Sequence, residues 1–239
     1  MSKYLSRADL ESIAAQLVVR YDQKFLSRGP LPSPIDPVKL AQEVLGLRVS
    51  YLPLSTDGSI LGVACFREAA IQVQQEDGNL SQIYLTGRDI VIDTDLLAKG
   101  QVGRHNFTVA HELSHHVLVQ SYPEDYQELL RCRTQVLYRK KHRTRDWVEW
   151  QADTLGAATI IPVTRLYELM FTFGLGGKLD MLSSFCRPKE YDAFCAIAQC
   201  LGVSKKALAI RMKQLGLLER DYLEHPTAPI DVWKGENED

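Results

Sequence analysis

The stretch NFTVAHELSHHVLVQ, residues 106–120, contains the pentad HELSH at residues 111–115. Apolar residues recur through this stretch at helical spacing, which predicts an α-helix. Residues i and i+4 lie on one face of a helix, so the imidazoles of His111 and His115 can reach the same metal ion. Glu112 would project beside that ion, where its carboxylate can take a proton from a bound water.

A catalytic zinc site has three protein ligands and an open fourth position for water or substrate. Glu149 lies near the start of the next helical segment, and Asp153 follows one turn later on the same face. Glu149 is the candidate third ligand. Asp153 is the candidate partner that accepts the second N–H of a ligand histidine and fixes its tautomer. An ExxxD pair is common by itself and gains meaning here because it follows an HExxH helix.

The alternative is a helix with two unrelated surface histidines. The chain has six histidines, and a shuffled sequence of this composition would contain such a pentad about once in a hundred. Chance is therefore the weaker explanation. A structural zinc site is also disfavoured, because such sites normally close with four Cys or His ligands.

The composition is that of a globular protein. The chain has 239 residues, of which 45% are hydrophobic and 24% are charged, with a formal net charge of −2. These values exclude disordered, collagen-like and disulfide-scaffold proteins, and they give no global electrostatic reason to expect nucleic acid or an anionic membrane as partner. The five cysteines contain no CxxC spacing. With no signal-like or membrane-spanning apolar run, we expect a reduced, cytoplasmic protein.

The sequence of the first half of the chain predicts two helices and a small sheet. Apolar spacing indicates a helix over 10–25, started by a capping box of Ser6 and Asp9. Asp36 is the expected N-cap of a second helix that stops at Gly46. β-rich segments follow at Arg48–Leu52, Leu61–Phe66, Ala70–Gln74 and Ile90–Ile92, with turn signals at 57–58 and 77–79. We interpret them as a small antiparallel sheet.

From about His105 onward the pattern is almost wholly helical. After the HExxH helix, we expect helices over 147–161, from Pro162, and about Lys189–Leu201 and Lys205–Leu215. Ser204 is the expected N-cap of the last helix, and the run 174–177 (GLGG) interrupts the series.

The segment Arg104–His116, RHNFTVAHELSHH, resembles the phrase RFTLAHELGHH of the ImmA/IrrE-type zinc metallopeptidases. Members follow it with E-x-x-A-N/D-x-F-A-x-x-L-L-x-P. The corresponding residues here are Glu149, Ala152, Asp153, Leu155, Gly156, Ile160 and Pro162. The resemblance covers about residues 10 to 220. Ser114 replaces a glycine and Leu155-Gly156 replaces Phe-Ala, and neither change removes a ligand.

The resemblance implies a zinc endopeptidase of narrow specificity. Its substrate would be a protein, often a transcriptional repressor or an immunity protein of a mobile element or stress response, in a bacterium. This substrate class comes from analogy and not from the residues of the site.

Four other residues are weaker candidates for the site. His116 lies about 100° round the helix from the ligand face, so we expect packing or solvent contact. His105 precedes the helix pattern and would reach the metal only through a turn. His142 and Tyr138 are candidates for stabilising an oxyanion, although the sequence does not identify the group that does so.

Two basic features suggest other partners. A run without acids contains Arg131, Arg133, Arg139, Lys140, Lys141, Arg143 and Arg145. We favour the interpretation that this run is a solvated surface. The alternative is that its positive charge attracts an acidic protein segment or nucleic acid. The helices over 189–215 have a helix-turn-helix outline with Lys205, Lys206, Arg211 and Lys213. Many helical hairpins share that outline, so we favour a protein partner over DNA and expect no membrane partner.

The sequence therefore predicts an α+β fold in which a small twisted antiparallel sheet packs with a zincin-like HExxH helix. The expected domains are a metallopeptidase core over 1–173, a C-terminal helical subdomain over 174–224 and a loose tail over 225–239. The expected cofactor is Zn²⁺. The alternative function is a metal-containing transcription regulator that binds DNA or protein without proteolysis.

Overall fold

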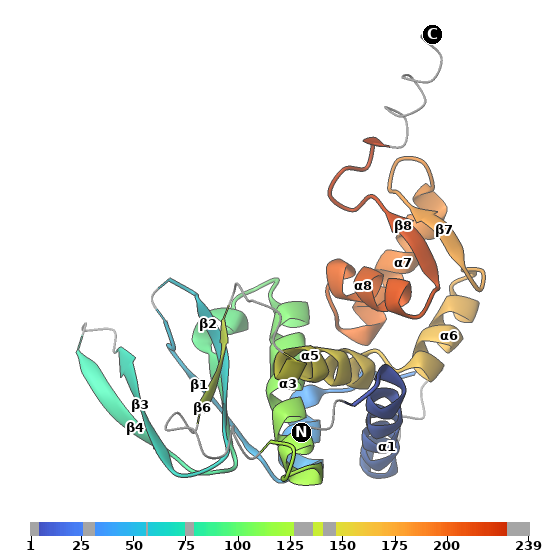
Figure 1. Ribbon diagram of the computed structural model, residues 1–239. Helices are drawn as coiled ribbons and strands as arrows, with labels where there is room; N and C mark the ends of the chain where they lie inside the picture. Colours follow the sequence, from blue (N-terminus) through green and yellow to red (C-terminus); the bar gives the residue numbers. More distant parts are fainter. Residues whose placement is uncertain are drawn as a thin grey trace. The chain divides into compact units, whose positions relative to one another are not determined.

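The computed structural model describes residues 5–25, 32–55, 57–74, 79–126, 136–140 and 147–228. The chain divides into two compact units (Figure 1). The first comprises Met1–Leu26 and Ile35–Ile160, and the second comprises Ser27–Pro34 and Ile161–Asp239. This division falls earlier than the boundary after residue 173 proposed from the sequence. The assignment of separate roles to a core and a C-terminal subdomain stays a prediction.

The first unit begins with the two helices expected from their capping residues. In front of α1 (Arg7–Phe25), the Ser6 hydroxyl accepts the N–H of Asp9 at 3.2 Å, and the Ser6 N–H donates to Asp9 Oδ2 at 2.9 Å. Asp36 Oδ1 accepts two backbone N–H groups at the start of α2 (Pro37–Lys39). The π-helical turn η1 (Leu40–Val44) continues α2 towards Gly46, whose φ of 65° ends the segment.

The sheet of the first unit is mixed. Its strands lie in the order β1 (Arg48–Leu52), β5 (Asp89–Asp93), β2 (Ile60–Cys65) and β6 (Val136–Lys140). β2 is antiparallel to β5 and to β6, whereas β1 is parallel to β5. The α+β class is confirmed, and the expectation of a wholly antiparallel sheet is wrong for this one pair. The long chain between β1 and β5 makes a parallel pairing feasible, because parallel neighbours need a crossover and not a tight turn.

A separate antiparallel hairpin pairs β3 (Ala69–Gln74) with β4 (Leu80–Leu85). β4 is not among the strands predicted from the sequence, and the turn signal at 77–79 that precedes it lies mostly outside the described residues. Side chains from this hairpin and from the sheet form one apolar cluster: Val63, Cys65, Ile71, Val73, Leu85 and Val91. The hairpin therefore covers one face of β2 and β5.

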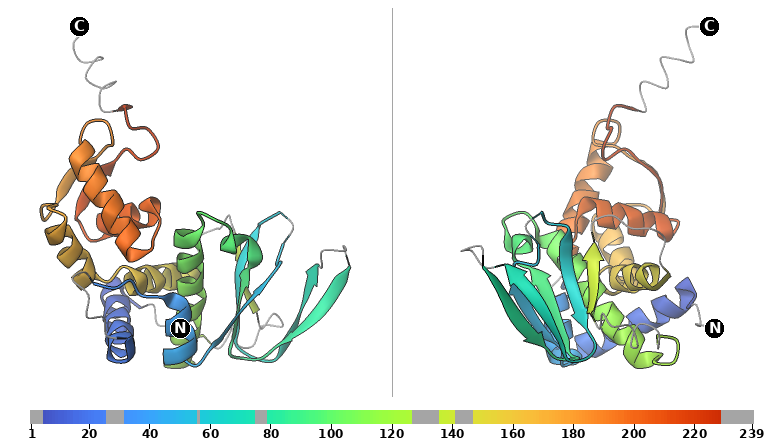
Figure 2. Two further views of the ribbon diagram at one scale, coloured as in Figure 1. Left: turned by 180° about the vertical axis from the view of Figure 1, so that it is seen from behind. Right: turned by 60° about the vertical axis from the view of Figure 1, so that its left-hand side comes forward.

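Helix α3 (Val102–Ser121) packs against the same two strands and carries the HExxH pentad (Figure 2). Successive residues of a strand face opposite sides of the sheet. Ile90 and Ile92 of β5 accordingly join Val109 and Leu113 of α3 in the main core. Helix α5 (Trp147–Ile160) packs against both α3 and α1. This three-helix layer places the helix that carries Glu149 beside the HExxH helix.

The second unit is helical with a two-stranded parallel ladder. Its elements are α6 (Val163–Thr172), β7 (Leu179–Leu182), α7 (Pro188–Leu201), α8 (Lys205–Gln214) and β8 (Leu218–Asp221). The helices agree with the sequence prediction, including the Ser204 hydroxyl that accepts the N–H of Ala207 at 3.1 Å. The expectation of an almost wholly helical chain from about His105 onward is wrong for β6, β7 and β8, whose short strands depend on pairing with distant segments. The predicted loose tail lies outside the described residues from residue 229 onward.

None of the described helices is by itself long and apolar enough to cross a bilayer. Helices α7 and α8 meet this condition only as a pair, by length and composition, with a bend of 101° between them.

The basic residues of α8 already have contacts inside the second unit. Lys205 Nζ lies 2.9 Å from the Tyr191 hydroxyl, and Lys206 Nζ lies 2.8 Å from Glu224 Oε1. Lys213 Nζ lies 2.5 Å from Asp221 Oδ2. Arg211 is fully buried and donates from Nε to the Ile161 carbonyl at 3.3 Å. Arg211 is therefore not available to a DNA groove, while the three exposed lysine contacts are of the weak kind that a phosphate can displace.

Replacing Arg211 with alanine is expected to destabilise the second unit. The change opens a cavity and leaves the Ile161 carbonyl without this donor, so the free energy of unfolding should fall by about 2–4 kcal/mol. Urea denaturation measures the effect. Lys213→Ala, which removes an exposed ion pair, is the matched control and should cost less than about 1 kcal/mol. Equal losses in the two variants would show that Arg211 is not a structural anchor.

Candidate metal centre

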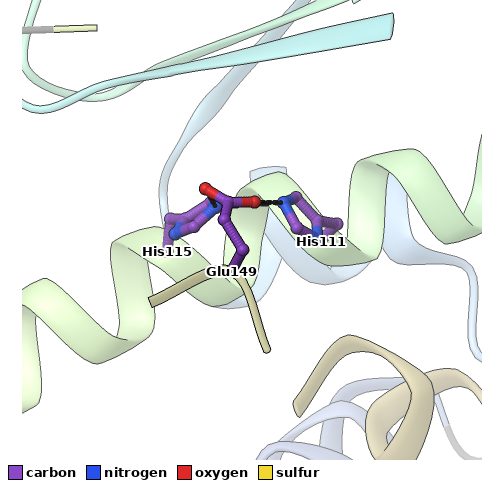
Figure 3. Close-up of side chains that lie close together, drawn as sticks. All are labelled: His111, His115 and Glu149. Atoms are coloured by element: carbon purple, nitrogen blue, oxygen red, sulfur yellow. Dashed lines mark hydrogen bonds and ion pairs between the residues drawn. The ribbon is translucent and has the colours of Figure 1, made fainter. Parts of the chain in front are cut away.

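Three side chains predicted as metal ligands meet between two helices. His111 and His115 come from α3 and Glu149 from the first turn of α5 (Figure 3). Their exposed fractions are 1%, 1% and 5%. One potential ligand atom from each residue lies within 4.8 Å of the other two. The structure therefore brings together the residues that the sequence nominated, and their role as ligands stays a prediction.

The separations between the donor atoms suit a small tetrahedral cation. His111 Nε2 lies 3.0 Å from His115 Nε2 and 3.0 Å from Glu149 Oε2. His115 Nε2 lies 3.5 Å from Glu149 Oε1. Zinc binds nitrogen and oxygen at about 2.0–2.1 Å, so tetrahedral ligands stand about 3.3–3.4 Å apart. The cluster matches that spacing to within a few tenths of an ångström.

Asp153 fixes the orientation of one imidazole. Its Oδ1 lies 2.8 Å from His111 Nδ1. An ionised carboxylate only accepts hydrogen bonds, so Nδ1 carries the proton and His111 Nε2 presents a lone pair. That lone pair faces the Glu149 carboxylate and the Nε2 atom of His115. A divalent metal ion placed between these atoms would satisfy all three groups.

Close packing of α3 and α5 makes this convergence possible. A methyl group at Gly156 would lie 3.1 Å from the carbonyl carbon and oxygen of Ala110 and 3.2 Å from the His111 nitrogen. Glycine therefore lets α5 pass closer to α3 than alanine would. Ser114, the other departure from the family phrase, donates its hydroxyl to the Ala110 carbonyl at 2.6 Å and so stays satisfied within its own helix.

Glu112 lies outside the ligand cluster, on the side of α3 that contacts β2. Its exposed fraction is 0%. A methyl group at Gly62 of β2 would come within 2.7 Å of Glu112 Oε1 and within 2.9 Å of Thr108 Cγ2. Gly62 and Thr108 are not among the site residues predicted from the sequence. The available signal was a glycine inside the apolar strand ILGVAC, a pattern that often marks a close approach by another part of the chain.

The other histidines have different surroundings. His116 is buried, with Nε2 3.3 Å from the Asp89 carbonyl and its ring edge-on to Phe66, so it packs as expected. Burial lowers the pKa of His116 to about 4, which keeps the imidazole neutral at pH 7. His105 stacks on Tyr51 and places Nε2 3.0 Å from the Tyr51 hydroxyl, away from the cluster.

The remaining sequence candidates fall outside what the structure describes. His142 lies in the segment 141–146, and the side chain of Tyr138 is not described although its backbone belongs to β6. Most of the basic run 131–145 is likewise outside the described residues. The roles suggested for these residues stay predictions.

Replacing Asp153 with alanine should weaken metal retention without disrupting the fold. Loss of the group that orients a ligand histidine typically costs 10–100-fold in metal affinity or activity, so we expect a drop of about that size. Zinc competition against a chromophoric chelator measures the affinity. Asp153→Asn keeps an oxygen acceptor for the His111 N–H, so its zinc affinity should fall by less. Wild-type affinity in Asp153→Ala would identify Asp153 as an ordinary surface acid.

The chain was compared with known proteins. No curated protein matches it significantly. A peptidase family model described as the IrrE N-terminal-like domain matches residues 42–213, well over half of the chain. The matched region contains α3, α5 and all three candidate ligands, and the resemblance seen in the sequence is thereby confirmed. The chain belongs to the IrrE N-terminal-like peptidase family.

Proposed function

We propose that the protein is a zinc-dependent endopeptidase that cuts a specific cytoplasmic protein. The observation that carries the proposal is the buried cluster of His111, His115 and Glu149 with Glu112 beside it. Two imidazoles and one carboxylate are one of the ligand sets found in catalytic zinc sites, which keep a fourth position open. Membership of a peptidase family supports the same chemistry.

The donor atoms fit zinc, which when bound lowers the pKa of its water to about 7 and polarises a carbonyl. In this proposal Glu112 accepts the proton of the attacking water and passes it to the leaving amine nitrogen. Asp153 keeps His111 in the tautomer that offers Nε2 to the metal. Burial of Glu112 and of the cluster excludes bulk water and so strengthens these electrostatic interactions.

The proposed substrate is a transcriptional repressor or an immunity protein in a bacterium. This step rests on the family resemblance, because the site residues describe peptide hydrolysis and not a particular target. The alternative of a regulator without proteolysis relies on helices α7 and α8. The burial of Arg211 weakens that alternative, whereas the exposed contacts of Lys205, Lys206 and Lys213 are weak enough for a phosphate to displace and do not count against it.

Co-expression tests the substrate assignment. The protein is produced together with repressor-like proteins encoded near its gene, and the products are analysed by mass spectrometry. We expect fragments of one repressor with the wild type and intact repressor with Glu112→Gln. A duplex-DNA mobility-shift assay on Glu112→Gln tests the alternative. Intact repressors in both strains, together with specific DNA binding, would favour the non-proteolytic regulator.

A further inference from the structure

Strand β2 presents its smallest residues to the helix that carries the candidate base. Gly62 is paired with Ile92 and Ala64 with Ile90, and both isoleucines belong to the core that includes α3. Val63 faces the opposite side of the sheet, in the cluster covered by the hairpin. At Gly62 and Ala64 the side chains that β2 turns towards α3 are therefore only a hydrogen atom and a methyl group.

The space at Gly62 is filled by Glu112. A methyl group there would lie 2.7 Å from Glu112 Oε1 and 2.9 Å from Glu112 Cγ, closer than ordinary contacts of a Cβ atom. Turning the terminal carboxylate about the Cγ–Cδ bond moves Oε1 but leaves Cγ in place, so the second contact remains. The whole Glu112 side chain would therefore have to take another rotamer.

Backbone conformation does not explain this glycine. Among the described residues, the glycines with positive φ are Gly46, Gly58, Gly100, Gly174, Gly202 and Gly216, and Gly62 is not one of them. The ladder between β2 and β6 also changes register here, since Ile60 pairs with Lys140 and Val63 with Tyr138. Three steps in one strand oppose two in the other, as in a bulge that redirects a strand next to a site.

We propose that Gly62 is a positioning residue that holds the Glu112 carboxylate where it acts as base. The inference rests on the proposed function, since it assigns Glu112 that role. The three atoms nearest to an added methyl group belong to Glu112 and Thr108, and none belongs to His111, His115 or Glu149. A side chain at position 62 thus displaces the base and spares the ligands.

Binding of acetohydroxamate to the zinc-loaded protein tests the proposal without a known substrate. This probe chelates zinc and gives a proton to a neighbouring carboxylate, so its affinity reports whether Glu112 is in place. Gly62→Ala should keep its zinc and bind the probe about 10–100-fold more weakly, the worth of a hydrogen bond to a charged group. Isothermal titration calorimetry gives the affinity, and elemental analysis gives the zinc content.

A double-mutant cycle separates this role from a merely structural one. If Gly62 acts through Glu112, adding Gly62→Ala to Glu112→Gln should cause no further loss of affinity. Thr108→Ser removes the methyl group that the new side chain would also meet. The double variant Gly62→Ala/Thr108→Ser should regain stability and not affinity, and it keeps the test usable if Gly62→Ala folds poorly. Gly176→Ala is the matched control, with no described atom within 4 Å of the added methyl group.

Four results would overturn the proposal. Two concern Gly62→Ala, which would bind acetohydroxamate as tightly as the wild type or would lose its zinc. The third is a double-mutant cycle in which the losses of acetohydroxamate affinity are additive. The fourth is a wild-type protein that binds acetohydroxamate no more tightly than Glu112→Gln does. Failure of the peptidase proposal has a different signature. In that case the wild type cuts no protein, while the cycle still shows that Gly62 acts through Glu112.

Discussion

His115→Ala is expected to lose its metal. The three candidate ligands are the minimum for a catalytic zinc site, and His115 Nε2 stands 3.0 Å from His111 Nε2 at the centre of the cluster. Removing it leaves two ligands and an open cavity. Zinc content, measured by elemental analysis after dialysis, should fall from about one atom per chain to near background.

His105→Ala is the control for this experiment. His105 lies on the same helix but contacts Tyr51 and not the cluster, so the variant should keep its zinc. Glu149→Ala should lose metal as His115→Ala does. A full complement of zinc in His115→Ala would contradict the assignment of His115 as a metal ligand. Unchanged zinc in Glu149→Ala alone would instead point to His142, the other candidate, which lies outside the described residues, as the third ligand.

Glu112→Gln is expected to keep its zinc and lose its peptidase activity. Glutamine preserves the size of the side chain in its tight contact with Gly62 but removes the basic carboxylate. General acid–base catalysis typically contributes 10²–10⁴-fold, so the rate of cleavage should fall by about that factor. The measurement is the kcat on a protein that the wild type cuts, with zinc content determined on the same preparation.

The substrate should still bind to Glu112→Gln, because the variant keeps the metal and the surrounding surface. A fall in kcat with little change in KM is therefore expected. The outcome that would contradict this prediction is measured in cells, by comparing the wild type with Glu112→Gln. If Glu112→Gln releases the genes controlled by the target repressor as well as the wild type does, proteolysis is not the output of this protein.

Local features of the site could be predicted from the sequence. The i and i+4 positions of His111 and His115 define their common face once the segment is helical. The capping residues Ser6 and Asp36 likewise determine where their helices begin. Glu149 is distant in sequence from His115, and the ExxxD pattern with the family resemblance was needed to nominate it.

Features that depend on distant segments were missed or misjudged. The parallel pairing of β1 with β5 follows from which strand lies beside which, and turn signals between consecutive strands favoured hairpins instead. Gly62 looks like any glycine in a strand until Glu112 of α3 is placed against it. The charge of Arg211 suggested a DNA contact, whereas its burial is decided by the packing of the second unit.

The most direct test of a zinc endopeptidase compares the new protein N-termini that one preparation creates with its metal and without it. Purified protein is added to a lysate of its own organism in the zinc-loaded form, after removal of zinc by a chelator, and after zinc is restored. Mass spectrometry identifies the N-termini. We predict new internal N-termini in one or a few proteins with zinc, their absence without it, and their return on reloading. The same N-termini from metal-free protein, or none from fully loaded protein, would contradict the account.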